Sequence, residues 1–418
     1  MMVNLMRRAI PWWIPSLGLI LMSLGWAACP LGAAHRIRLG IEVLATEHPE
    51  LVRGKRLALL VSPTAYDQGL RHVIDRLAKA ATIEVIFTGD PFFRETMPGE
   101  TSGQKLDALT NARVIEVLDP LARPAITDLG KAQALVIDIQ DIGIRYFSYV
   151  TLLAQFLDLG REAKLPVFVL DRPNPLGGET VAGPVLEVDF RSQFGVYPIP
   201  LVYGLTVGEL ALFFNKVFGI GANLTVIGME GYSRRMSYRQ TGLHWLPPSD
   251  HLPEPETPLY YATTGFLGEM GVFSTGVGTT RPFHYVLAPW IDGELLAQKL
   301  SRHQLPGVRF LPTSVKSYYG LYQQKKIPGI EIVIEEPGIY DPFLTGVAIL
   351  RNLWEIYPDK IPLANPTVSG GLDTLLGGPQ VRTAIQKGTP LFQIHAEIQP
   401  RLLEYRKRRK AFLIYPEE

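Results

Sequence analysis

A chain of 418 residues is longer than one average domain and gives two domains room for ample cores. Its residues are 47% hydrophobic and 19% charged, a globular composition that argues against a disordered chain. The formal net charge is only +1, so the chain lacks the excess of Lys and Arg that nucleic-acid binding requires. We therefore expect no nucleic-acid partner.

The first thirty residues resemble an export signal. Arg7 and Arg8 form a basic start, and residues 14–28 form an apolar run that is short for a membrane span. We expect residues 1–30 to send the protein out of the cytoplasm, to the periplasm or the cell surface. A retained membrane anchor is the alternative.

Cys29 is the only cysteine, so an intramolecular disulfide is impossible. It follows two alanines at the end of the apolar run, as in a bacterial lipoprotein attachment site, although Trp26 stands where such sites usually carry Leu. Two outcomes stay open: lipid attachment at Cys29, or a cysteine that is removed or inert. Any membrane contact would come only through this N-terminal segment.

Apolar runs alternate with helix-period stretches in the first half of the chain, which predicts an α/β fold with a parallel sheet and helices on both faces. In such a sheet, ligands bind outside the carboxyl ends of the strands. The predicted strands are 56–62, 82–88, 114–118, 134–139 and 167–171, and the predicted helices include 70–80 and 146–163.

The second half mixes helices and strands and contains a Pro-, Gly- and Thr-rich stretch at 246–282. Thr206 and Glu209 have capping-box spacing, which predicts a helix from Thr206 to about Val217. We place a domain boundary near residue 205, giving a sheet domain at 37–205 and a smaller α+β domain at 206–418. Further predicted strands are 224–229 and 329–335, and further predicted helices are 292–303, 343–357 and 399–409.

Polar side chains follow the fourth and fifth predicted strands. Carboxylates can serve acid/base chemistry on a sugar, aromatic rings can pack on it, and Arg or amide groups can bind its substituents. The alternative is structural: one Asp caps the next helix and Arg145 pairs with the other, while the proline-rich loop is a rigid turn. The two clusters are Asp138, Gln140, Asp141, Arg145, Tyr146 and Tyr149, then Asp171, Arg172 and Asn174.

Asp90 follows the second strand and could face the same crevice, completing a carboxylate pair. Other chemistries lack their motifs. Ser62-Pro63-Thr64 stands where a dinucleotide-binding glycine loop would begin, and no nucleophile elbow or phosphate loop occurs. The eight histidines show no ligand spacing, so we expect no metal and no cofactor.

The same segments resemble the exo-β-N-acetylmuramidase family, formerly a domain of unknown function, from about residue 39 into the C-terminal half. The resemblance implies a Rossmann-like domain joined to an auxiliary domain, with the active site in the cleft between them. It also implies hydrolysis of terminal N-acetylmuramic acid from peptidoglycan fragments without a cofactor. The matching blocks are 136–149, 170–178, 182–185, 190–192, 195–201, 204–211 and 288–292.

Several positions depart from the family pattern. The family carries Gly-Pro-Glu-His-Gly-x-Arg-Gly after the second strand; aligning Arg94 with its Arg puts Asp90 at the Glu and Pro91 at the His. Tyr203 replaces the His of a His-Gly-Met-Thr block, and Val277 replaces an Arg suited to a carboxylate. Glu269 falls in the segment that replaces Glu-Gly-Thr-Asn and could stand in for its Glu.

The leading hypothesis is a glycosidase acting on peptidoglycan-derived aminosugars. Asp90 or Glu269 would be the general acid, with Asp138 or Asp141 as the opposed carboxylate. The alternative is a non-catalytic glycan-binding protein of the cell envelope that has lost part of the active site. The residues expected to bind or enclose the substrate are Gln140, Arg145, Tyr146, Tyr149, Asp171, Arg172, Asn174 and Tyr203.

Overall fold

The computed structural model describes residues 36–90 and 105–417. The predicted export signal with Cys29, and the loop residues Pro91 and Arg94, lie outside the described residues. The described residues all fall in one compact unit, so the division at residue 205 stays a prediction. In the described part, no helix has both the length and the apolar character needed to span a bilayer.

A seven-stranded sheet forms the larger layer, in the order β3-β4-β2-β1-β5-β6-β9. All neighbouring pairs are parallel except β3 with β4 at the edge, which confirms the α/β fold with a mostly parallel sheet. The strands are β1 Arg56–Val61, β2 Thr82–Thr88, β3 Lys105–Leu106, β4 Arg113–Glu116, β5 Ala134–Asp138, β6 Pro166–Leu170 and β9 Asn223–Ile227.

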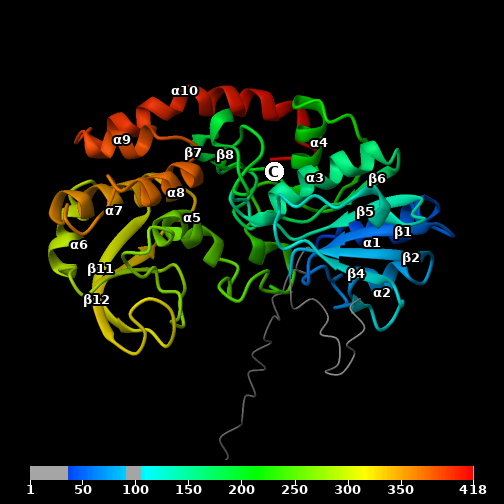
Figure 1. Ribbon diagram of the computed structural model, residues 1–418, viewed down its shortest axis with the longest axis horizontal. Helices are drawn as coiled ribbons and strands as arrows, with labels where there is room; N and C mark the ends of the chain where they lie inside the picture. The colour runs from blue at the N-terminus through cyan, green and yellow to red at the C-terminus, as the bar shows by residue number, and fades with distance from the viewer. Residues whose placement is uncertain (1–35, 91–104, 418) are drawn as a thin grey trace, which may run out of the picture. The chain divides into compact units, whose positions relative to one another are not determined.

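Helices cover both faces of this sheet (Figure 1). Side chains alternate along a strand, so Leu57 and Leu59 pack into the core with α1 (Gly40–Glu47) and α2 (Val73–Leu77). Ala58 and Leu60 pack on the opposite face with α3 (Ser148–Glu162) and α4 (Val207–Val217). Both faces of β1 are therefore buried, which explains its unbroken apolar sequence.

The predicted capping box of α4 is confirmed. The Thr206 hydroxyl accepts the main-chain N–H of Glu209 at 3.3 Å, and the Glu209 carboxylate accepts the N–H of Thr206 at 3.0 Å. Helix α4 and strand β9 lie beyond residue 205 yet belong to the layers of the large sheet. The sheet therefore extends past the predicted boundary.

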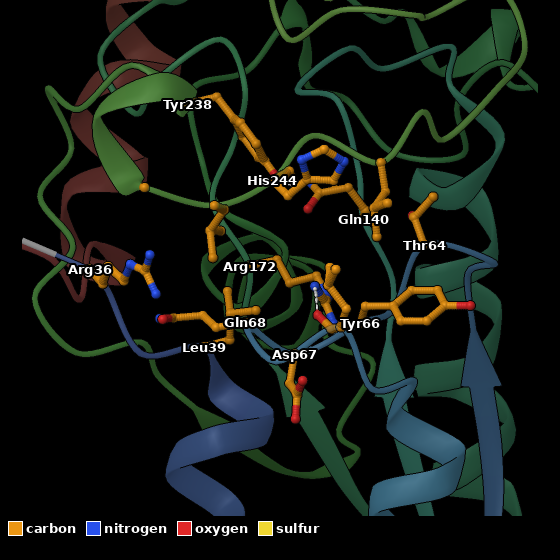
Figure 2. Close-up of a pocket in the computed structure, with 14 residues that line it drawn as sticks. Arg36, Leu39, Thr64, Tyr66, Asp67, Gln68, Gln140, Arg172, Tyr238 and His244 are labelled. Carbon is orange, nitrogen blue, oxygen red and sulfur yellow. Dashed lines mark hydrogen bonds between the residues drawn. The ribbon is translucent and has the colours of Figure 1, made fainter. Parts of the chain in front are cut away.

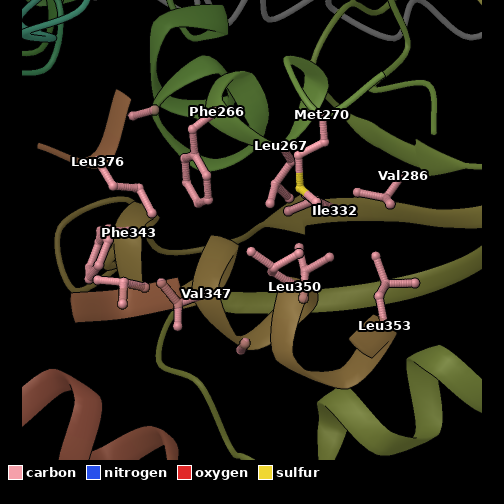
Figure 3. Packing of buried hydrophobic residues seen from close by; sticks show 14 of the residues in the cluster. Phe266, Leu267, Met270, Val286, Ile332, Phe343, Val347, Leu350, Leu353 and Leu376 are labelled. Atoms are coloured by element: carbon pink, nitrogen blue, oxygen red, sulfur yellow. The ribbon is translucent and has the colours of Figure 1, made fainter. Parts of the chain in front are cut away.

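The C-terminal half contains a three-stranded antiparallel sheet, ordered β10-β12-β11, with helices packed on it. Figure 3 shows the core that they share, including Phe266, Met270, Phe343 and Leu350. The elements are β10 Tyr285–Leu287, β11 Val308–Lys316, β12 Lys326–Ile334, α5 Thr257–Gly268, α6 Gly293–Ser301, α7 Pro342–Ile356, α8 Pro366–Leu376 and α9 Gln380–Gln386.

The long helix α10 (Leu391–Arg409) connects the C-terminal segment to the first half. The Tyr405 hydroxyl donates to the carbonyl of Tyr203 at 2.8 Å, and Arg409 donates to the carbonyl of Gly204 at 2.5 Å. A two-stranded hairpin, β7 (Ala182–Val185) with β8 (Pro200–Val202), packs against it. Short 3-10 helices occur at Pro49–Leu51, Ile126–Leu129, Val188–Phe190, Tyr238–Thr241 and Lys410–Phe412.

Candidate active site

A pocket of about 220 Å³ opens at the carboxyl edge of the large sheet (Figure 2). It lies where the strand order reverses, because β1 has β2 on one side and β5 on the other. Such a switch point is the usual ligand crevice of an open α/β sheet. Polar residues that line it come from several elements: Thr64, Tyr66, Asp67 and Gln68 after β1, Gln140 and Arg172 after β5 and β6, Arg36 before α1, and Tyr238 and His244 after β9.

Asp138 lies beneath this pocket in a buried ion pair with Arg172. Both side chains are at most 5% exposed, and Arg172 Nη2 lies 3.1 Å from Asp138 Oδ2. Arg172 Nε also donates to Asp138, while Nη1 donates to the carbonyl of Tyr66 at 3.0 Å. Asp138 is thus fully buried and neutralised, so the predicted role of an opposed catalytic carboxylate has no support from its position.

Asp141 is also buried, but none of the described Lys, Arg or His side chains forms an ion pair with it. Its Oδ2 accepts the main-chain N–H of Gly143 at 2.8 Å and the hydroxyl of Tyr203, whereas Oδ1 has no hydrogen-bond partner in the described structure. Burial raises the pKa of Asp141 to about 7 despite the opposing main-chain hydrogen bonds. Tyr203 is fully buried and donates to this carboxylate, so its position supports a structural role and gives the predicted substrate contact no support.

Asp171 anchors the start of α4. It accepts the hydroxyl of Thr206 and the N–H of Gly208, both at 2.7 Å, and the hydroxyl of Tyr415 at 2.5 Å. Burial raises its pKa to about 6 against these bonds. The carboxylate is fully enclosed, so the predicted substrate contact is replaced by a structural joint.

Asn174 forms a turn, as the structural alternative for the proline-rich loop requires. Its amide donates to the carbonyl of Leu205 at 3.0 Å, and its Oδ1 accepts the N–H of Leu176 at 2.9 Å. Gln140 uses its amide similarly, donating to the carbonyls of Asp141 at 2.8 Å and Pro173 at 3.0 Å. Gln140 nevertheless lines the pocket, whereas Asn174 does not.

Arg145 is completely buried and joins three segments. Its guanidinium donates to the carbonyls of Pro184 and Ile199 at 2.9 Å and of Leu375 at 2.7 Å. Burial lowers its pKa to about 9. Arg145 is not accessible, so its position gives the predicted contact with substrate no support. Its acceptors are main-chain carbonyls and not the Asp of the structural alternative.

An aromatic row lies at the start of α3. The Tyr146 hydroxyl donates to the carbonyl of Tyr261 at 2.8 Å, and the two rings meet edge to face with centroids 5.1 Å apart. Tyr149 follows, with the ring of Phe147 at 5.6 Å. Burial raises the pKa of both Tyr146 and Tyr149, so both phenols stay neutral. Both rings are at most 5% exposed, so they support the surface more than they form it.

Asp90 and Glu269 are the two predicted carboxylates in contact with water. Asp90 is half-buried at the end of β2, where its N–H donates to the hydroxyl of Thr88 at 3.3 Å. Glu269 is exposed at the end of α5. Both act electrostatically on the aromatic row, because the charge of Asp90 helps to raise the pKa of Tyr149 and that of Glu269 helps to raise the pKa of Tyr146.

Several pocket residues escaped the sequence analysis. Thr64 and Tyr66 follow β1, which lies at the switch point of the sheet. Knowledge of the strand order would therefore have identified them as pocket residues. Arg36, Tyr238 and His244 come from segments without a motif, and only the fold brings them together. Over the ranges that the structure covers, no three His, Cys, Asp or Glu side chains are grouped to hold a metal ion.

Comparison with known proteins extends over most of the chain. Residues 57–256 match the family model "Exo-beta-N-acetylmuramidase NamZ, N-terminal", and residues 259–415 match the corresponding C-terminal model. The chain is 31% identical, over 383 residues, to the peptidoglycan beta-N-acetylmuramidase NamZ of Bacillus subtilis (strain 168), with 91% of this chain and 92% of the relative covered.

Two crystal structures of DUF1343 family proteins from Bacteroides fragilis share the fold. One is 30% identical with a TM-score of 0.85, covering 91% of this chain and 99% of the other. The second is 24% identical with a TM-score of 0.71 and the same coverage, a likeness that shows the fold alone.

Proposed function

The chain belongs to the exo-beta-N-acetylmuramidase NamZ family, and we propose that it is a glycosidase that removes N-acetylmuramic acid from the ends of peptidoglycan fragments. The observation that carries this proposal is the 31% identity to a peptidoglycan beta-N-acetylmuramidase over nearly the full length of both proteins. The same likeness disfavours the alternative of a glycan-binding protein without activity.

We propose Asp90 and Glu269 as the two working carboxylates. Glycoside hydrolysis requires one carboxyl group to protonate the leaving oxygen and a second to act as base or nucleophile. Both groups must reach the substrate, and of the four candidate acids only these two contact water. The charge of Asp90 acts on Tyr149 and that of Glu269 acts on Tyr146, which supports a sugar site near this pair of tyrosines.

The pocket at the switch point supports an exo mode of action. Its volume of about 220 Å³ lies below the range of about 300–1,000 Å³ typical of drug-sized ligand sites. A space of this size suits one sugar or one sugar substituent. Gln140 and Arg172, both predicted as substrate ligands, line it. A pocket that holds one terminal residue favours chain ends over internal linkages.

We further propose that the protein works outside the cytoplasm, where peptidoglycan lies. The basic start and apolar run of residues 1–30 support export, and Cys29 supports lipid attachment. Expression with the signal intact, followed by cell fractionation and mass spectrometry of the mature N-terminus, tests both. A diacylglycerol mass on Cys29 that Cys29→Ser abolishes would establish the anchor, and a cytoplasmic full-length chain would refute export.

The activity itself is tested with chromogenic β-N-acetylmuramide and β-N-acetylglucosaminide. We expect release of the chromophore from the muramide, and release of N-acetylmuramic acid from peptidoglycan fragments by mass spectrometry. Saturable calorimetric binding of these fragments without any product would instead establish the non-catalytic alternative.

A further inference from the structure

The lining of the switch-point pocket carries more positive than negative charge. Its charged and ionisable lining residues are Arg36, Asp67, Arg172 and His244. The charge of Arg172 is neutralised by the buried carboxylate of Asp138. Asp67 brings no negative charge to the pocket, because its side chain is fully buried and accepts the N–H of Arg71 at 2.9 Å and an ion pair from Arg76.

Figure 2 shows the carboxylate of Asp67 turned away from the pocket and the guanidinium of Arg36 turned toward it, beside Gln68. Arg36 is exposed, and it makes no ion pair with any residue of 36–90 or 105–417. One uncompensated guanidinium therefore faces a polar pocket in which the described residues provide no exposed carboxylate. This arrangement suits an anionic ligand.

The main chain fixes the position of Arg36 although its side chain is exposed. The next two residues are anchored: the N–H of Ile37 donates to the carbonyl of Thr241 at 3.5 Å, and the N–H of Arg38 donates to that of Glu230 at 2.9 Å. Ile37 itself is fully buried in the core beneath α1. The base of the Arg36 side chain is thus held at the pocket mouth.

We propose that Arg36 is a specificity-determining residue that binds the carboxylate of the lactyl group of N-acetylmuramic acid. The inference rests on the proposed function and deepens it. A guanidinium binds a carboxylate through two parallel hydrogen bonds, a geometry that an ammonium group does not provide. The His244 ring, the Gln68 amide and the Thr64 hydroxyl supply further polar groups to the lining of the same pocket.

The location also fits the reaction. Strands β1 and β2 are neighbours, with Leu60 opposite Phe87, so Thr64 and Asp90 follow adjacent strands at the same edge of the sheet. Adjacent strands are about 4.8 Å apart. We infer that a sugar whose lactyl group occupies the pocket extends toward the end of β2, where Asp90 stands. N-acetylglucosamine lacks this carboxylate, so Arg36 would discriminate between the two aminosugars by binding only N-acetylmuramic acid.

The test compares Arg36→Ala and Arg36→Lys with the matched control Arg53→Ala, since Arg53 is an exposed arginine away from the pocket. The specificity constant kcat/KM is measured for the chromogenic muramide and glucosaminide, and thermal unfolding checks folding. We expect Arg36→Ala to lower kcat/KM for the muramide by about 10- to 100-fold, as for a lost hydrogen bond to a charged group. The glucosaminide value should not change, and Arg36→Lys should recover only part of the loss.

Equal losses on both substrates, or no loss on the muramide, would overturn the proposal while leaving glycosidase activity intact. Calorimetry of free N-acetylmuramic acid and N-acetylglucosamine on the same full-length proteins separates the two claims. If the wild-type protein cleaves neither substrate but prefers N-acetylmuramic acid, and Arg36→Ala removes that preference, the carboxylate site stands and the enzymatic proposal fails. Equal affinity of the wild-type protein for both sugars would refute the site.

Discussion

The five candidate carboxylates fall into two groups, one buried inside the protein and one in contact with water. Asp138, Asp141 and Asp171, at or just after the ends of β5 and β6, are buried and bound by protein donors. Asp90 at the end of β2 and Glu269 at the end of α5 reach water. A dense polar motif at a strand end can therefore hold loops together instead of meeting a ligand.

The physical reason lies in desolvation. A buried carboxylate is tolerated when hydrogen bonds or a cation compensate for the lost water, and each compensating group must itself be polar. Asp171 alone requires Thr206, Gly208 and Tyr415. Structural burial of acids thus creates the same local enrichment in polar residues that a sugar site would create. Three mutations probe the buried region, in order of expected effect.

Removing the guanidinium of Arg172, the partner of buried Asp138, should have the largest effect on stability. Arg172→Met leaves the Asp138 carboxylate buried without its partner, and such losses cost about 3–5 kcal/mol. Chemical denaturation measures the change in the free energy of unfolding. The double variant Arg172→Met/Asp138→Asn, which removes the stranded charge, should recover much of the loss. A single variant as stable as the wild type would contradict the buried-pair account.

Neutralising Asp141 should change the pH dependence of stability. Its folded pKa of about 7 lies above the ordinary 3.8, so between these pH values the folded protein holds a proton that the unfolded chain releases. Stability therefore falls as pH rises through this window and stays low above it. Asp141→Asn removes that dependence.

One pKa unit corresponds to about 1.36 kcal/mol, and a partly unsatisfied amide offsets part of the gain. We expect Asp141→Asn to be more stable than the wild type at pH 8 by on the order of 2 kcal/mol. The difference should disappear near pH 4, where both forms are neutral. Denaturation curves at several pH values measure the difference in the free energy of unfolding between the two proteins. A difference that stays constant from pH 4 to pH 8 would contradict this explanation.

Removing one hydroxyl at the C-terminal anchor should have the smallest of the three effects. The hydroxyl of Tyr415 donates to Asp171 at 2.5 Å and accepts the N–H of Met229 at 2.9 Å. Tyr415→Phe should cost about 1–2 kcal/mol because two buried groups lose a partner while Asp171 keeps its other donors. Tyr318→Phe at an exposed tyrosine is the control. Equal melting temperatures for both variants would show that the anchor contributes nothing.

The sequence could predict the sheet and its helices because their signals are local. Continuous apolar runs predicted β1, β2, β5 and β6 within a residue or two, and capping-box spacing located α4. Helix α5 was missed because it lies in the Pro-, Gly- and Thr-rich stretch and is buried on most sides, which removes the amphipathic period. Burial of Arg145 could not be predicted, since its acceptors lie as far along the chain as Leu375.

The central claim is that the accessible carboxylates perform the chemistry and the buried ones hold the fold. The most direct measurement compares turnover of chromogenic β-N-acetylmuramide by Asp90→Asn, Glu269→Gln and Asp141→Asn, each with its melting temperature. We predict losses of about 10²–10⁴-fold for the first two at unchanged stability, as for a lost acid or base group, and near wild-type turnover for the third. Loss of turnover in Asp141→Asn with retention in the other two would contradict the account.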